Sequence, residues 1–234
     1  MAVITISRQY GSGGDEIAAR LGELLGYPHF NKTLIQKAAA EAGISEPEIL
    51  DYSEESHKVQ GFLERLFSPR SFTATSRVWL ETGGGARFVE ETALSEEMVL
   101  SLVQKAIRSG ARQDNMIIIG RGGQAILRDE PNALHVRVEA PIEDRIARVK
   151  EILHQELNLP HTDLELRRRA QDLITERDAA SADYLKRFYH IDWADPIHYH
   201  LVLNTGRMTI FQAADIIAVS LRTLAMEHSS IEPA

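Results

Sequence analysis

The N-terminal stretch constrains the fold more than any other part of the chain. An apolar run at residues 2–6 is followed by a glycine-rich segment at residues 7–14 and then by apolar residues at helical spacing over 17–25. A strand that leads into a glycine loop and then a helix is the architecture of a phosphate-binding loop, because loop amides and the helix N-terminus both favour an anion. The stretch therefore predicts an α/β fold with an anion site after its first strand.

Composition narrows the class of protein. The chain has 234 residues, of which 44% are hydrophobic, and this suits one large α/β domain or a core with a smaller lobe. It contains no cysteine, which excludes disulfides, thiol nucleophiles and cysteine metal sites and agrees with a cytoplasmic location. The net charge of −8 makes broad affinity for nucleic acid unfavourable. There is no apolar run of about 18 residues and no leader-like start, so we expect no membrane partner.

Strand and helix patterns alternate along the rest of the chain. Residues 116–119 form a continuous apolar run, typical of a strand that is covered on both faces of a parallel sheet, and a second glycine loop follows at 120–123. Further strands are predicted at 133–138 and 198–203, and helices from 141, over 163–180 and over 209–226. The alternation indicates a doubly wound parallel sheet, in which ligands bind at the carboxyl ends of the strands. Both glycine loops follow strands at that edge and can therefore form one site.

The middle of the chain is less regular. Residues 27–30 suggest a second strand or the entry to a strand, and Asn31 resembles the N-cap of the next helix. The region 59–92 suggests helical and irregular pieces that form a lid, an insertion or an oligomer contact, and residues 92–109 suggest a helix. Because 62–79 is rich in aromatic residues that a partner could cover, a homo-oligomer is possible.

Three groups of residues resemble the cytidylate kinase-like family, a nucleoside monophosphate kinase branch of the P-loop NTPases. The first is the glycine segment at 4–14 with the residues at 16–18, and the second is 119–123, which is similar to the family's Gly-Arg-Asp-x-Gly loop. The third is Glu-Arg-Asp at 176–178, followed by tyrosines, a Trp-Ala-Asp-Pro run at 193–196 and Asn-Thr at 204–205. The likeness is strongest over 1–40 and 117–215 and weak over 45–115.

The resemblance implies a P-loop nucleoside monophosphate kinase-like core with a parallel five-stranded sheet flanked by helices, a helical insertion and a lid. It places all of 1–234 in a single domain, with a core at 1–40 and 110–225, an insertion at about 45–110 and a lid at about 153–187. The implied reaction transfers the γ-phosphoryl group of ATP to CMP, dCMP or a related small acceptor, with Mg²⁺. The expected partner is therefore a small-molecule nucleotide substrate.

The resemblance also assigns roles to individual residues. Arg121, in the second loop, would contact the monophosphate, with Gly122, Asn31 and Asp178 also binding substrate. Arg177 belongs to the lid-end motif and would act in catalysis. The residues that would hold the nucleotide cofactor are Gly11, Ser12, Gly13, Gly14, Asp15 and Glu16.

The first loop departs from the standard motif at two positions. Gly14 occupies the usual place of the phosphate-binding lysine, and Glu16 that of the Mg²⁺-binding hydroxyl residue. Arg8 is a candidate for the missing cation, and Ser7 or Ser12 for the missing hydroxyl. Two other interpretations therefore stay open: a nucleotide-sensing module without efficient chemistry, or a structural domain with an empty site.

Other charged residues allow both a functional and a structural interpretation. Arg145 and Arg148 lie where such kinases carry lid-base arginines, whereas the arginines at 167–169 suit either a lid or a solvated helix face. The histidines show no metal-ligand spacing, so no metal site is predicted for them. Trp193 and Tyr199 suggest packing around the last strand.

Overall fold

The computed structural model describes residues 2–31, 34–35, 37–38, 74–81, 87–94, 96–113, 115–156 and 162–229. The chain divides into two compact units. The first consists of Met1–His29 and Gln113–Ala234, and the second of Phe30–Arg112. None of the helices within the described ranges is long and apolar enough to cross a membrane.

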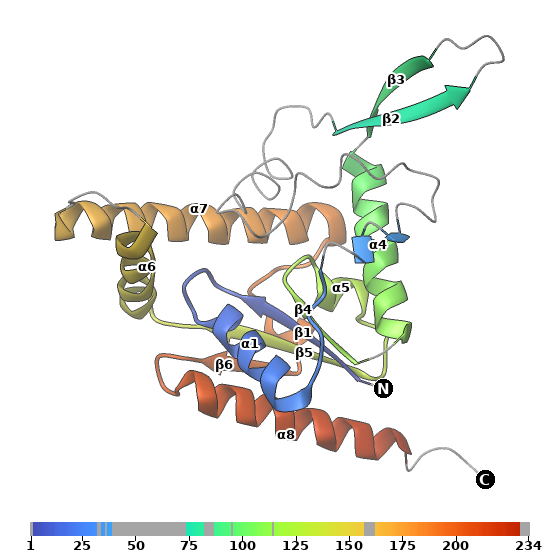
Figure 1. Ribbon diagram of the computed structural model, residues 1–234. Coiled ribbons are helices and arrows are strands. Elements are labelled where there is room, and N and C mark those ends of the chain that lie inside the picture. Colours follow the sequence, from blue (N-terminus) through green and yellow to red (C-terminus); the bar gives the residue numbers. More distant parts are fainter. Residues whose placement is uncertain are drawn as a thin grey trace. The chain divides into compact units, whose positions relative to one another are not determined.

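A parallel sheet forms the centre of the first unit (Figure 1). Its strand order is β4 (Met116–Ile119), β1 (Val3–Arg8), β5 (Ala133–Glu139) and β6 (Leu201–Asn204). All three neighbouring pairs are parallel, and Val3 pairs with Met116 on one side and Ala133 on the other. The predicted parallel α/β fold is confirmed, and the two glycine loops follow the neighbouring strands β1 and β4.

The predicted number of five strands is wrong for this sheet, which has four strands within the described part of the chain. The stretch predicted as an additional strand at 27–30 contributes only an isolated parallel bridge between His29 and Ile117. There the Ile117 N–H donates to the Pro28 carbonyl at 3.0 Å. Proline has no N–H of its own to extend a ladder, so the pairing at this edge stays at one residue.

One face of the sheet is apolar and covered by two helices, α1 (Gly14–Leu25) and α8 (Ile210–Ser229). The strands direct alternate residues toward them, among which Ile4, Ile6, Val136 and Val138 are buried. The helices supply the rest of the core. Burial of each such side chain contributes about 1.5–3 kcal/mol, which makes this face the main stabilising core of the unit.

Helices α5 (Gly123–Ile126) and α7 (Asp163–Tyr189) lie on the other side of the sheet, and α6 (Ile142–Glu156) lies beyond the carboxyl ends of the strands. Helices α6 and α7 pack through an apolar cluster that includes Val149, Leu166 and Ile174. Helix α7 begins with a capping box between Thr162 and Glu165 and continues past the predicted end at 180. A short 3₁₀ helix, η2 (Pro196–His198), precedes β6.

The second unit contains an antiparallel strand pair, β2 (Ala74–Glu81) and β3 (Arg87–Leu94), and helix α4 (Glu96–Gln113). The prediction of helical and irregular pieces is therefore wrong for these two stretches, and the predicted helix from 92 begins at Glu96. Both strands contain β-branched and aromatic residues, which suit a paired strand. Residues 59–73 and 82–86 of the predicted region lie outside the described residues.

Candidate phosphate-binding site

The first glycine loop has the backbone of an anion cradle. Strand β1 ends at Arg8 and helix α1 begins at Gly14, with Gly11 and Gly13 between them in left-handed conformation at φ 76° and 85°. Gly13 occupies the N-cap of α1 and has no side chain with which to cap the first-turn amides. Those amides are the groups that a phosphate accepts hydrogen bonds from, and the helix dipole adds to the attraction.

Neighbouring elements press against the glycines of this loop. A Cβ on Gly11 would lie 2.8 Å from Cγ2 of Val149 in α6, and one on Gly13 would lie 2.5 Å from Cδ1 of Ile210 in α8. Any side chain at these positions would displace a packed helix as well as strain the backbone. The loop can therefore lie close to both helices because Gly11 and Gly13 have no side chain.

Arg8 occupies the space beside Gly14. A Cβ on Gly14 would lie only 2.5 Å from Cβ of Arg8, so the two positions cannot both carry ordinary side chains in this arrangement. A Cβ on Gly120 would lie 3.0 Å from Nη1 of Arg8, so the guanidinium extends from the first loop to the second. Asp15 pairs with it at 3.2 Å, and the Arg8 side chain is 28% exposed.

The second glycine loop has three consecutive left-handed residues: Gly120 at φ 64°, Arg121 at 54° and Gly122 at 70°. This conformation costs a non-glycine residue about 1–2 kcal/mol, so the backbone at Arg121 is strained. Aromatic residues of α7 hold it there. The Tyr184 hydroxyl donates to the Arg121 carbonyl at 3.5 Å, and a Cβ on Gly122 would meet the Tyr189 ring at 2.7 Å.

The protonation state of Tyr184 supports this contact. Burial, and then the neighbouring Tyr189, raise the pKa of the Tyr184 phenol well above its ordinary value. The side chain therefore stays a neutral phenol at physiological pH and keeps the proton that it donates to the second loop.

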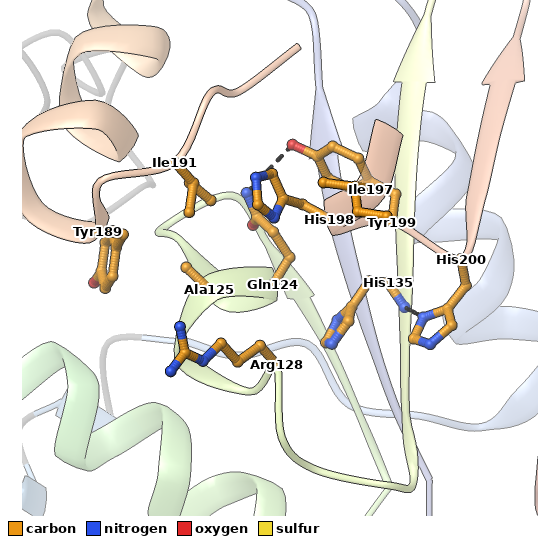
Figure 2. A pocket seen from close by; sticks show the side chains of 10 residues that line it. All are labelled: Gln124, Ala125, Arg128, His135, Tyr189, Ile191, Ile197, His198, Tyr199 and His200. Carbon is orange, nitrogen blue, oxygen red and sulfur yellow. Dashed lines mark hydrogen bonds between the residues drawn. The ribbon is translucent and has the colours of Figure 1, made fainter. Parts of the chain in front are cut away.

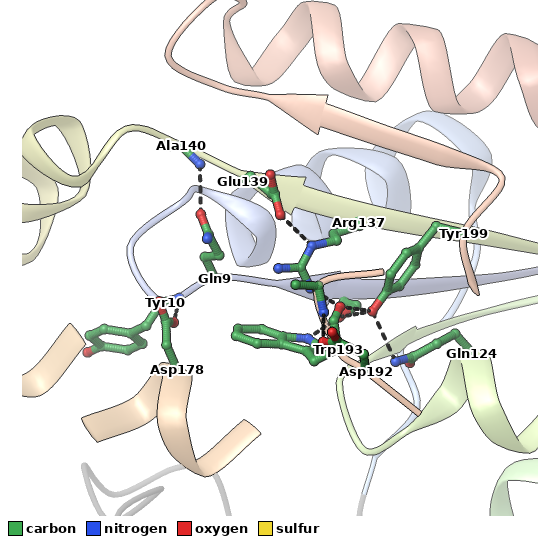
Figure 3. Close-up of polar contacts among 12 residues, drawn as sticks. Gln9, Tyr10, Gln124, Arg137, Glu139, Ala140, Asp178, Asp192, Trp193 and Tyr199 are labelled. Atoms are coloured by element: carbon green, nitrogen blue, oxygen red, sulfur yellow. Dashed lines mark hydrogen bonds and ion pairs between the residues drawn. The ribbon is translucent and has the colours of Figure 1, made fainter. Parts of the chain in front are cut away.

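The lid-end motif touches the first loop itself (Figure 3). Asp178 accepts a hydrogen bond from the Tyr10 N–H at 2.9 Å and forms an ion pair with Arg145. The guanidinium of Arg177 lies over the Tyr10 ring, 5.7 Å from its centroid. The structure thus brings Arg177 and Asp178 to the phosphate loop, in helix α7. Asn31 lies in the second unit, where its side chain accepts from the Leu34 N–H at 3.4 Å.

Two arginines of α6 hold the carbonyls of the first loop. Arg148 donates to the Gly11 carbonyl at 3.2 Å and to both the hydroxyl and the carbonyl of Thr205, which follows β6. Thr205 in turn donates to the Ser12 carbonyl at 2.6 Å, and Arg145 reaches the Tyr10 carbonyl at 3.4 Å. These contacts orient the loop by its oxygen atoms. Sequence reasoning placed Thr205 in the family's tail but did not identify it as a loop contact.

The two candidate hydroxyls lie inside the protein. Ser7 accepts hydrogen bonds from Trp193 Nε1 at 2.7 Å and from the Tyr199 hydroxyl at 3.4 Å. Ser12 is fully buried, and its Oγ has no hydrogen-bond partner among the described residues. Asp15 and Glu16 are instead exposed at the start of α1. The oxygen atoms that a cation could reach most directly at this loop are therefore carboxylates.

Sequence reasoning missed Arg137, which lies in β5 beside the site (Figure 3). Its guanidinium lies 4.4 Å from the centre of the Trp193 ring, donates to the Trp193 carbonyl and pairs with Glu139. The signal was the alternation of His135, Arg137 and Glu139 within an otherwise apolar strand. Such alternation places the three side chains on one face of the sheet.

Comparisons with known proteins show the family to which the chain belongs. The model of a family described as the cytidylate kinase-like family matches residues 3–207. Over 124 residues the chain is 29% identical to a cytidylate kinase of Methanosphaerula palustris. The matched stretch covers 53% of this chain and 62% of that protein. Over 112 residues it is 28% identical to a cytidylate kinase of Methanosarcina acetivorans, covering 48% and 57%. The chain thus spans about three fifths of the length of these curated relatives.

A solved structure supports the fold alone. An uncharacterized protein from Eubacterium ventriosum aligns over 95% of this chain and 99% of its own, with a TM-score of 0.59 and 17% sequence identity. Identity at this level carries no information on substrate or residue roles.

Proposed function

Because the chain belongs to the cytidylate kinase-like family, we propose that it is a phosphotransferase that moves the γ-phosphoryl group of ATP to CMP, dCMP or a related small acceptor. The family match confirms the resemblance seen in its three motifs. One observation supports the activity most strongly: two glycine loops follow neighbouring parallel strands, and Arg8 extends from one loop to the other. Two phosphate groups that react with each other require two such sites side by side.

In this proposal the first loop binds the nucleotide cofactor through its amides. Gly11, Gly13 and Gly14 form the cradle, which fits a chain of phosphates because these residues have no side chain to hold a phosphate away from the backbone amides. Asp15 and Glu16 would hold Mg²⁺ together with the phosphates, and bound Mg²⁺ supplies neutralisation of phosphate charge. Ser12 would support the cradle, because its side chain is buried, its N–H donates to the Gln9 carbonyl and its own carbonyl accepts from Thr205.

The arginines would place positive charge beside the phosphate oxygens on which negative charge develops during transfer. In transfer, an acceptor phosphate oxygen attacks the γ-phosphorus, the bond to the β-bridging oxygen breaks, and ADP leaves. Arg8 would take the role of the absent lysine, because its guanidinium lies between the loops. Arg121 and Gly122 would hold the acceptor phosphate, and Arg177 would act from the lid helix. Asp178 would support them by fixing Tyr10 in the first loop.

A second candidate function is a nucleotide-sensing module that binds nucleotide without efficient transfer. The observation that favours it is the charge balance of the loop, where Asp15 pairs with Arg8 and offsets its charge. The buried hydroxyls of Ser7 and Ser12 also leave the loop without the usual hydroxyl ligand.

One experiment separates these functions. The purified full chain is incubated with ATP, Mg²⁺ and each of a panel of nucleoside monophosphates that includes CMP and dCMP, while ADP formation is measured by a coupled assay and binding by calorimetry. We expect acceptor-dependent ADP formation. Saturable binding without ADP formation would favour the sensing module, and the absence of both would overturn both functions.

A further inference from the structure

The sheet face beneath α5 carries a polar strip. Thr5 and Ser7 of β1 and His135 and Arg137 of β5 are all buried, and they project from the face opposite the apolar core. Strands buried on both faces of a parallel sheet are ordinarily apolar throughout. A buried polar group requires a partner, so each of these side chains needs one on this face.

A cavity of about 240 Å³ lies at the His135 end of this strip, between α5 and the segment 189–200 (Figure 2). Its polar lining consists of Gln124, Arg128, His135, His198, Tyr199 and His200. Isoleucine and tyrosine side chains complete the wall, and no carboxylate of the described part of the chain lines it. Its lining includes none of the residues at 9–14 or 120–122, although Tyr189 in its wall also contacts Gly122 of the second loop.

His135 is the buried group in this cavity, at 4% exposure. Its Nδ1 is bonded to the Thr5 hydroxyl at 2.8 Å, and its ring stacks on His200 with centroids 5.0 Å apart. His200 Nδ1 accepts the backbone N–H of His135 at 2.9 Å. These contacts fix the ring, whereas Nε2 forms no hydrogen bond of ordinary length and angle with a described residue. An unpaired buried nitrogen beside a cavity is a position that a ligand atom can satisfy.

The electrostatics of the cavity favour an anion. Burial, and then His200, lower the pKa of His135 to about 4, against the smaller opposite effect of a hydrogen bond to the Leu127 backbone, so the ring is neutral at physiological pH. The permanent charge in the lining is that of Arg128, whose side chain is 73% exposed. It pairs with the adjacent and more exposed Asp129 through Nε at 3.2 Å, and exposed pairs of this kind are weak enough to exchange.

We propose that this cavity is a second binding site, which takes a small organic anion with a planar body. The anionic group would pair with Arg128, the planar body would lie against the tyrosine and isoleucine side chains, and a polar atom of the ligand would satisfy His135 Nε2. A volume of about 240 Å³ accommodates a single substituted ring.

The test is a titration of the full chain, labelled with ¹⁵N in its histidine rings, followed by NMR at neutral pH. Benzoate is the probe and benzamide its neutral counterpart of the same shape, and the His135 signal is assigned by its loss in His135→Gln. We expect benzoate to shift the His135 Nε2 signal saturably and benzamide to bind about tenfold more weakly. Arg128→Gln should weaken benzoate binding about fivefold, whereas the control Arg222→Gln, on the exposed side of α8, should leave it unchanged.

Two results would overturn the proposal. If benzoate causes no saturable shift at His135 up to about 10 mM, the cavity is not a site for planar anions. If benzoate and benzamide bind equally, or Arg128→Gln changes nothing, the preference for an anion is wrong. Arg128 is exposed on the surface, so its variant should fold normally, and this is checked by an unchanged thermal unfolding midpoint.

Discussion

The Arg8 side chain fills the space that a side chain at position 14 would need. The usual lysine would begin at position 14, but a Cβ there would lie 2.5 Å from Cβ of Arg8. The loop can therefore carry its cation at position 8 or at position 14, and this chain carries it at position 8. Arg8 therefore supplies a positive charge near the place of the missing lysine, while its catalytic role stays a prediction.

Arg8→Ala tests that role. We expect the rate of phosphoryl transfer to fall about 10²-fold or more, because a charge beside the reacting phosphates is lost. Arg8→Lys should retain part of the rate, since it keeps the charge but not the planar fork. Rates come from the coupled ADP assay, with Arg222→Ala as the control for loss of an exposed arginine. Undiminished transfer in Arg8→Ala would remove Arg8 from the catalytic residues.

Gly14→Ala tests the packing. At an ordinary helix position alanine is favoured over glycine by about 1 kcal/mol, so propensity alone predicts stabilisation. The contact with Arg8 should reverse the sign and lower the free energy of unfolding by about 1–3 kcal/mol. Urea denaturation measures the change, and Ala19→Gly on the exposed face of α1 reports the propensity term alone. A Gly14→Ala protein more stable than the parent would contradict this packing.

Helix α7 links both glycine loops. Asp178 binds the Tyr10 N–H of the first loop, while Tyr184 and Tyr189, farther along the same helix, contact the second loop. The helix also packs on α6, whose arginines hold the first loop. The predicted lid helix is therefore part of the scaffold of the site, and a movement of this helix would change its contacts with both loops.

Asp178→Asn should show how much the scaffold depends on this contact. The variant keeps an oxygen for the Tyr10 N–H but removes the charge that faces the buried Arg145. We expect a loss of about 2–4 kcal/mol in the free energy of unfolding, measured by denaturant titration. The matched control is Glu143→Gln, which breaks the exposed pair with Arg167 and should cost less than about 1 kcal/mol. Similar losses in the two variants would show that the Asp178 pair has no special weight.

The first unit as a whole combines an apolar and a polar sheet face. The apolar face, with α1 and α8, provides most of the burial energy, whereas the polar face beneath α5 places ionisable groups in the interior. Such groups make stability depend on pH, because the folded and unfolded chains bind different numbers of protons.

His135 makes that dependence predictable. Its pKa is lowered from 6.5 to about 4, so the unfolded chain takes up the proton first as the pH falls. Above pH 6.5 the residue is neutral in both states and does not lower the free energy of unfolding. As the pH falls from 6.5 toward about 4, protonation in the unfolded chain lowers that free energy by about 3 kcal/mol at most. Unfolding free energies measured across this range should fall less steeply in His135→Gln than in the parent. The exposed His154→Gln serves as the control, and a parallel fall in all three proteins would contradict the prediction.

Local sequence patterns were sufficient for the elements nearest the site. The order of strand, glycine loop and helix and the second loop after residues 116–119 follow from apolar runs and glycine spacing, which act over a few residues, whereas the family came from the resemblance of three motifs. The count of strands and the pair β2–β3 did not follow, because pairing depends on a partner elsewhere in the chain. A short apolar or aromatic stretch has no pattern that distinguishes a full strand from a single bridge.

The sequence by itself determined that this protein has two glycine loops at one edge of a parallel sheet, since each loop is specified by its own neighbours. Only the tertiary structure decided what surrounds them. The contact of Tyr10 with Asp178 joins positions 168 apart, and that of Thr5 with His135 joins positions 130 apart. Contacts over such separations arise from the packing of helices on the sheet. No local pattern encodes them, and they placed Arg8 between the loops and left His135 Nε2 unpaired beside a cavity.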